Sequence, residues 1–243
     1  MNIVFTMAGK YSRFKLFGAK VPKYLLPLGQ STILDKVIHE IKICGIHFNY
    51  YFIANRDDQL FYPILRSIFS QHDIPHENLI YIENTSSQLE TAIKASELIE
   101  GNSQIKPICF ANIDTVVRGR GAFFDVLKKM PCESALLDTF NGRSSKYSYA
   151  RSDEFGNVLE VVDQNIVSEF ACSGLYGFGS FEVMRGLAAE LLKENNLSNF
   201  TTLYNLYIKK DLPVQHVHSE RMSDTVVLGT PEEYVINIHK FIK

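Results

Sequence analysis

The strongest indication of the fold is the stretch Met7-Ala8-Gly9-Lys10-Tyr11-Ser12-Arg13-Phe14, which continues directly from the apolar run Asn2–Met7. An uninterrupted apolar run of this length is typical of a parallel strand that is buried on both faces. Ligands of open α/β sheets bind at the carboxyl ends of such strands. Here the strand would lead into a loop whose backbone N–H groups, at residues 9–12, can surround phosphate oxygens. The stretch therefore predicts a phosphate-binding loop at the start of an α/β sheet.

Two cations follow closely on this loop in the sequence. Arg13 carries a planar guanidinium that can contact two phosphate oxygens at once, and Lys23, within Pro22-Lys23-Tyr24-Leu25-Leu26-Pro27-Leu28, supplies a point charge. A triphosphate needs such a set of donors. A basic surface loop between two core strands would contain the same glycine and the same charges, so the residue types alone favour neither interpretation.

Strands and helices alternate through the first half of the chain. Further apolar runs predict three more buried strands, at Tyr50–Ala54, Ile80–Ile82 and Pro107–Ala111. Helices are expected from a capping Ser31 to Gly45, around Phe61–Phe69, and from the capping box Ser87-Gln88-Leu89-Glu90 onward. This alternation is typical of a mainly parallel sheet with helices on its faces.

The second half of the chain has a different pattern. Short strands separated by turn residues are predicted at Ser134–Asp138, Tyr147–Arg151, Val158–Val162 and Ala171–Phe178. A helix at Phe181–Leu192, a strand at Val214–Val217 and a last helix beginning at Thr230-Pro231 follow. No repeat or linker interrupts the chain, so we expect one α/β domain over residues 1–243, with a mixed, mainly parallel central sheet flanked by helices and a more antiparallel second half.

Composition excludes several classes of protein. The 25 basic and 27 acidic residues give a net charge of −2, which argues against a nucleic-acid partner. No apolar run is long enough to cross a membrane and the start has no basic leader, so a cytoplasmic protein without a membrane partner is expected. The four cysteines are far apart in the sequence and are expected to be free thiols. The sequence leaves a homo-oligomer possible.

Two later segments could complete a site. Asn112-Ile113-Asp114 follows the strand Pro107–Ala111 directly, where a carboxylate can bind Mg²⁺ together with phosphate oxygens, although an aspartate also commonly ends a strand in a turn. The polar helix start at Gln88 suits contact with a base edge or a ribose, and an ordinary capping box explains it equally simply.

The loop resembles the signature of the sugar-phosphate nucleotidyltransferases, in the M-A-G-x-G-S-R-F…P-K-x-L form of capsule and surface-polysaccharide gene products. The matching positions are Met7, Ala8, Gly9, Ser12, Arg13, Phe14, Pro22, Lys23, Leu25 and Pro27. The resemblance implies a Rossmann-like, GT-A-like fold in which the loop from Ala8 through Gly9, Lys10, Tyr11 and Ser12 binds the nucleotide. It also implies that Arg13 and Lys23 are catalytic and stabilise charge at the reacting phosphorus. Tyr11 replaces the second glycine, and it either narrows the approach to phosphate or gives a ligand an aromatic neighbour.

The resemblance extends along nearly the whole chain. Ser87-Gln88-Leu89-Glu90-Thr91 resembles the G-Q-x-x-T segment beside the base, which implies that Gln88 binds the nucleotide. Asn112-Ile113-Asp114 resembles N-x-D, which implies a nucleotide contact for Asn112 and a metal ligand in Asp114. Both segments thus gain a function that their residue types alone do not require.

In the second half the resemblance implies an acceptor pocket. Asp163 and Gln164 stand where the family has E-K, and Gly174 stands in the strand that lines the pocket, where a glycine lets the ligand come close. Leu228-Gly229-Thr230-Pro231-Glu232-Glu233-Tyr234 resembles the segment D-x-G-T-P-E-D-Y, so the second metal aspartate of the family falls on Val227, which cannot bind Mg²⁺. Asp224, three residues earlier, is the candidate replacement.

Together these features predict a magnesium-dependent nucleotidyltransferase that joins an NTP to a phosphorylated small molecule and releases pyrophosphate. The short chain and the M-A-G-x-x-S-R-F form resemble the cytidylyl branch, so CTP is favoured. Gln164 in place of lysine favours an acceptor other than a hexose 1-phosphate, such as an amino-acid phosphate of the phosphoglutamine type in capsule synthesis. One alternative is a sugar-1-phosphate nucleotidyltransferase; another is a catalytically degenerate nucleotide-binding regulatory protein, which Tyr11 and Val227 would suit.

Overall fold

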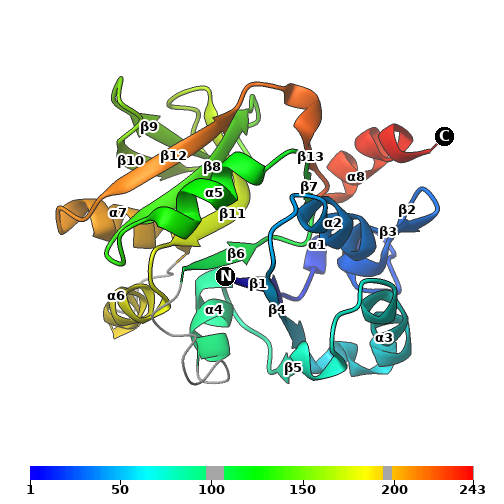
Figure 1. Ribbon diagram of the computed structural model, residues 1–243. Coiled ribbons are helices and arrows are strands. Elements are labelled where there is room, and N and C mark those ends of the chain that lie inside the picture. The colour runs from blue at the N-terminus through cyan, green and yellow to red at the C-terminus, as the bar shows by residue number, and fades with distance from the viewer. Residues whose placement is uncertain (97–106, 194–198, 243) are drawn as a thin grey trace.

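A mixed sheet runs through the computed structural model, which describes residues 1–96, 107–193 and 199–242, and helices cover both of its faces (Figure 1). Among the described residues the sheet has nine strands, in the order β10-β9-β11-β6-β1-β4-β5, with β8 paired to β11 and β12 paired to β8. The first-half strands are β1 (Asn2–Met7), β4 (Asn49–Asn55), β5 (Leu79–Ile82) and β6 (Ile108–Ala111). The second-half strands are β8 (Ala135–Asn141), β9 (Ser148–Ser152), β10 (Val158–Asp163), β11 (Phe170–Phe178) and β12 (Val214–Ser219).

The two halves of the chain meet in this sheet at β6 and β11. Strand β1 pairs in parallel with both β4 and β6, and β4 pairs in parallel with β5. Strand β11 then runs antiparallel to β6, with Leu175 opposite Ala111, and β8 and β9 pair antiparallel with β11. The loops after β1 and β6 therefore leave the sheet at the same edge, because parallel strands end together there.

The helices form one layer on each face of the sheet. Side chains from α2 (Ile33–Lys42), α3 (Tyr62–Gln71) and α5 (Gly121–Lys129) pack into one core. Side chains from α4 (Gln88–Ser96), α6 (Phe181–Lys193) and α7 (Phe200–Lys209) pack into the other. Along β1, Ile3 and Phe5 point into the first core and Val4 into the second. Both faces of β1 are thus buried, which is why its sequence is apolar without alternation.

A small second sheet brings the C-terminal segment to the end of β6. Strand β13 (Thr225–Val227) pairs antiparallel with β7 (Thr115–Val117), and the Leu228 N–H donates to the Asp114 carbonyl at 2.7 Å. The buried guanidinium of Arg120 holds this arrangement, because it bonds to the Asp138 carboxylate in β8 at 2.7 Å and also to the Thr225 hydroxyl. Breaking such a buried pair by removing one partner costs about 3–5 kcal/mol.

Short elements complete the described chain. They are α1 (Ser12–Leu16), α8 (Pro231–Asn237), the hairpin of β2 (Pro27–Leu28) with β3 (Ser31–Thr32), and 3₁₀ turns at Lys23–Leu25, Arg56–Phe61, His76–Asn78, Met222–Asp224 and Ile238–Phe241. No helix in the described ranges is both long and apolar enough to span a membrane.

The fold class predicted from the sequence is confirmed, with local corrections. The cap of α2 is Thr32, whose hydroxyl accepts from the Asp35 N–H at 3.2 Å, and is not Ser31. At the start of α4, Ser87 caps the Glu90 N–H as expected, but the Glu90 carboxylate accepts from Ser86 instead of closing the box on Ser87. All four cysteines are free, as predicted. Helices α5 and α7 and the β7–β13 pair were not predicted.

Candidate functional site

The predicted phosphate loop lies where β1 leaves the sheet. Ala8 is buried at the strand end, Gly9 and Lys10 are exposed, and α1 begins at Ser12. Residues of this loop line a cavity of about 670 Å³ whose opposite wall is the start of α4, including Ser87 and Gln88. The loop therefore borders a space between β1 and α4, as a nucleotide-binding loop in an open α/β sheet would.

Tyr11 adopts the backbone conformation that glycine favours, with φ 39° and ψ 40°, at the position where the resemblance has glycine. A left-handed conformation costs a non-glycine residue about 1–3 kcal/mol unless its surroundings hold it. The Tyr11 hydroxyl donates to the Asp58 carboxylate at 2.8 Å, and the Tyr24 hydroxyl donates to the same carboxylate at 3.0 Å. The ammonium of Lys15 lies 4.5 Å from the centre of the Tyr11 ring. These contacts fix the ring beside the loop, so the loop keeps a glycine-like turn without a glycine.

Removing the Tyr11 hydroxyl should destabilise the protein. Burial raises the pKa of the Asp58 carboxyl, and the hydrogen bonds from the two tyrosines partly offset this by stabilising the charged form. We expect Tyr11→Phe to lower the free energy of unfolding by about 1–3 kcal/mol, because one acceptor oxygen of a buried carboxylate loses its donor. Urea denaturation measures the change. Tyr62→Phe is the control, because the Tyr62 side chain is exposed at the start of α3. A Tyr11→Phe protein as stable as the wild type would refute this role.

Gln88, Asn112 and Gly174 are brought together at the junction of the two halves. The Gln88 Nε2 donates to the Asn112 Oδ1 at 2.7 Å, and the Asn112 N–H donates to the Gly174 carbonyl at 2.9 Å. Gly174 has φ 96°, and a Cβ on it would lie 2.7 Å from the Asn112 Nδ2. The space above Gly174 is therefore occupied by the Asn112 side chain and is not left for a ligand. This corrects the expectation that Gly174 itself gives the acceptor a close approach.

Lys23 and Asp114 form an ion pair at the centre of the site. The Lys23 Nζ lies 2.5 Å from the Asp114 Oδ2, and both side chains are partly exposed. Together with Tyr11, Ser12, Arg13, Phe14 and Gly229 they line a cavity of about 360 Å³. In the described ranges Arg13 makes no ion pair, so its guanidinium is available to an anion. Asp114 can also serve a divalent cation, because Mg²⁺ takes carboxylate oxygens as ligands and Lys23 can turn from Asp114 to a bound phosphate.

A third cavity, of about 200 Å³, opens from Asp114 toward the antiparallel half. Its lining combines charged groups with hydroxyl and thiol groups, contributed by Arg13, Asn112, Asp114, Thr115, Lys146, Tyr147, Ser148, Cys172, Ser173, Tyr176, Val227, Gly229, Thr230 and Glu233. Sequence patterns did not single out Lys146, Tyr147 or Glu233 as site residues. The signal that could have found Glu233 was its place in the segment that resembles D-x-G-T-P-E-D-Y, where only Val227 and Asp224 were considered for the metal.

Asp163 and Gln164 lie outside the lining of this cavity. Both are exposed at the end of β10, and the Asp163 Oδ1 accepts from the Ser148 hydroxyl at 2.7 Å. The Gln164 N–H donates to the Tyr147 carbonyl at 3.0 Å, with the Gln164 backbone at φ 55°. The two residues thus contact the lining residues Ser148 and Tyr147 but do not line the cavity themselves.

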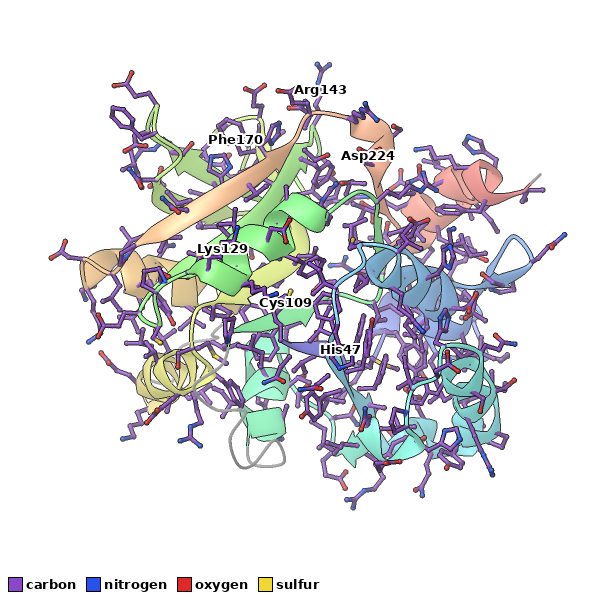
Figure 2. The ribbon with its side chains drawn as sticks, viewed as in Figure 1. His47, Cys109, Lys129, Arg143, Phe170 and Asp224 are labelled. Atoms are coloured by element: carbon purple, nitrogen blue, oxygen red, sulfur yellow. The ribbon has the colours of Figure 1, made fainter. Side chains whose placement is uncertain are left out.

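Asp224 is not brought to Asp114. Because β13 pairs antiparallel with β7, Thr225 lies opposite Val117, and the Asp224 carbonyl accepts from the Arg118 N–H at 2.7 Å. Arg118 is four residues beyond Asp114, so about 3.3 Å per residue places Asp224 roughly 13 Å along the strand. Figure 2 shows Asp224 in the segment that leads from β12 into β13. In the described part of the chain no three His, Cys, Asp or Glu side chains cluster as a metal site.

The chain was compared with known proteins. No family model matches it, and no curated protein matches it. Among solved structures it is similar to a nucleoside-diphosphate-sugar pyrophosphorylase from Vibrio cholerae, at 20% identity, with a TM-score of 0.77 over 98% of this chain and 99% of the other. It is also similar to a Bacillus anthracis protein described as a glucose-1-phosphate thymidylyltransferase, in complex with sucrose, at 14% identity, with a TM-score of 0.77 over 98% and 94%.

A third similar structure is a UDP-glucose pyrophosphorylase in complex with UDP-glucose, at 15% identity, with a TM-score of 0.76 over 99% of this chain and 97% of the other. All three alignments span nearly the full length of both chains, and all three identities are low. The chain therefore has the fold of these nucleotidyltransferases.

Proposed function

We propose that the chain is a magnesium-dependent nucleotidyltransferase that converts an NTP and a phosphorylated small molecule to the nucleotidyl acceptor and pyrophosphate. The observation that carries the proposal is the convergence of Arg13, Lys23 and Asp114 on one cavity beside the loop after β1. A protein that only binds nucleotide does not need all three groups at one place. The shared fold supports the same class of reaction.

The residues can support an in-line displacement at the α-phosphorus. An acceptor phosphate oxygen attacks, a new P–O bond forms, and the bond to the β-phosphate breaks so that pyrophosphate leaves. The attacking oxygen is already anionic, so the protein needs no general base, and its task is positioning and charge stabilisation. The loop N–H groups and Arg13 would hold the β and γ phosphates, and Lys23 would neutralise charge that develops at the α-phosphoryl group.

Asp114 would hold the Mg²⁺ ion, which when bound supplies positive charge to phosphate oxygens. The ion pair between Lys23 and Asp114 fits this assignment, because it keeps both groups beside the cavity until substrate arrives. Lys23 then exchanges the carboxylate for phosphate.

CTP is the proposed nucleotide, and binding distinguishes it from the other three NTPs. A ligand present at 100 times its Kd stabilises the folded protein by about 2.7 kcal/mol. Thermal unfolding with each of the four NTPs and Mg²⁺ should therefore show the largest rise in Tm with CTP. The rise should be lost in Arg13→Ala. If no NTP changes the Tm, the proposal is wrong at its first step.

The proposed acceptor is a phosphate that carries N–H or C=O groups, such as phosphoglutamine, in capsule or surface-polysaccharide precursor synthesis. The argument rests on Gln164, which lies next to the cavity lining: its amide offers donors and an acceptor, whereas a lysine would offer donors and a full charge but no acceptor. A sugar 1-phosphate is the second candidate, and it is favoured by the sugar nucleotides and sugar phosphates named for the similar structures.

Gln164→Lys is expected to shift acceptor preference toward simple phosphosugars. A lysine at this exposed position, next to the cavity-lining Tyr147, adds a full charge that any phosphomonoester can use. The ratio of kcat/KM for glucose 1-phosphate to kcat/KM for phosphoglutamine should rise in the variant. Efficient turnover of glucose 1-phosphate by the wild type would contradict the amide acceptor and favour the sugar 1-phosphate.

A further inference from the structure

The carboxylates of Asp114 and Glu233 both lie near one point over Gly229. A Cβ on Gly229 would lie 3.3 Å from the Asp114 Oδ2 and 3.6 Å from the Glu233 Oε2. Any side chain at this position would therefore intrude between the two acids. Gly229 also lines the cavity that contains Arg13 and Lys23, so the open space continues toward the groups assigned to the triphosphate.

Glu233 has an oxygen that no described residue satisfies. Its Oε1 is buried and, within the described ranges, has no hydrogen-bond partner; its Oε2 is the oxygen near Gly229, and Tyr147 is a neighbour of the same carboxylate. The pKa of Tyr147 is raised, mainly by burial and to a smaller extent by the nearby Glu233 charge. A buried carboxylate oxygen without a partner is costly, so natural structures usually give such an atom a ligand, a proton or an ion.

The backbone that carries Glu233 is fixed by the fold. The Thr230 hydroxyl accepts from the Glu233 N–H at 3.2 Å, which caps the first turn of α8. Strand β13 places the preceding residues beside Asp114, because Val227 lies opposite Thr115 and the Leu228 N–H donates to the Asp114 carbonyl. The chain thus turns at Gly229, and the first turn of α8 places the Glu233 carboxylate near Gly229 and Asp114.

We propose that Glu233 supplies the second protein carboxylate of the metal site, in place of the ligand that Val227 cannot provide. The inference rests on the proposed function, since the cation is the one that accompanies the triphosphate. Mg²⁺ takes one or two carboxylates and completes its shell with phosphate oxygens and water. Asp114 and Glu233 offer that set of protein donors, because the Asp114 Oδ2 and the Glu233 Oε2 both lie within 3.6 Å of one point over Gly229.

The test measures how much a divalent cation improves CTP binding. Calorimetry gives the Kd of CTP in Mn²⁺ and in EDTA, and the ratio of the two is the metal-dependent gain. Glu233→Gln should reduce this gain at least about tenfold, since even groups behind the ligands of a metal contribute 10–100-fold to its affinity. Glu232→Gln is the matched control, because Glu232 is exposed on the same turn and pairs with Lys146, and it should keep the full gain.

A second variant keeps the test independent of any folding defect. The double variant Val227→Asp, Glu233→Gln introduces a carboxylate at position 227, opposite Thr115 and next to Asp114. The metal-dependent gain in CTP affinity should then recover. A Glu233→Gln protein with the full gain, while Asp114→Asn loses it, would overturn the assignment of Glu233 and leave the nucleotidyltransferase intact. A wild type that binds none of the four NTPs even in Mn²⁺ would instead refute the proposed function.

Discussion

Lys23→Ala is expected to lower kcat/KM by about two to three decades, the effect of removing one preorganised charge donor from a reacting centre. The loss should fall mainly on kcat, because the Lys23 charge matters most as the α-phosphorus reacts and less when the nucleotide binds. Arg13→Ala should cause a loss of similar size that includes a rise in the KM for the nucleotide. Steady-state pyrophosphate release measures both parameters.

Lys20→Ala is the control for these variants, because Lys20 is an exposed lysine in the segment between α1 and the turn at Lys23. It should retain turnover. Near-wild-type turnover in Lys23→Ala or in Arg13→Ala would remove that residue from the catalytic group, whatever its place beside the cavity.

Asp114→Asn is expected to have the second large effect, a fall in activity of about two decades or more that raised Mg²⁺ recovers only in part. The variant keeps the shape of the side chain and removes its charge, so the loss reports the metal and not the packing. The Lys23 ammonium also loses its ionic partner in a mostly buried pair, so the free energy of unfolding is measured beside the activity to separate the two effects.

Asp224→Asn should be nearly silent, since β13 holds Asp224 at its far end from Asp114. This matched substitution distinguishes a local metal ligand from a general requirement for acidic residues. Full activity in EDTA would reject the metal scheme as a whole.

The sequence predicts the first half of this fold well because its signals are local. The buried strand at Asn2–Met7 and the loop after it follow from an apolar run that ends at a glycine. The meeting of this loop with Asp114 also follows, because parallel strands β1 and β6 end at one edge. The resemblance then assigned Arg13 and Lys23, which residue types alone left undecided.

The remainder depends on contacts between distant parts of the chain. The β7–β13 pair joins residues more than a hundred positions apart, and no local pattern in Thr225–Val227 marks its partner. That pair excludes Asp224 from the site and, through Gly229, brings Glu233 into it. Helix α7 was missed although Asn199 and Thr202 form a capping box, because its apolar face is largely aromatic and such residues also favour strands.

A match to a position in a family motif was also a weak guide to what the residue contacts. Gln164 matches the place of a ligand-binding lysine, yet it lies at the exposed end of β10 and supports Tyr147 through its backbone. Gly174 matches a pocket glycine, yet Asn112 fills the space above it. In both cases a contact from a segment next to another strand, the Tyr147 carbonyl or the Asn112 side chain, decides what the position touches.

The most direct test of the account is acceptor-dependent pyrophosphate release from CTP in the presence of Mg²⁺, with the nucleotidyl product identified by mass. We expect pyrophosphate to appear only when a phosphorylated acceptor is present, in equal amount to a cytidylylated product, and to disappear in Lys23→Ala. CTP that binds tightly but yields no pyrophosphate with any amino-acid phosphate or sugar phosphate would contradict catalysis and identify a nucleotide-binding regulatory protein.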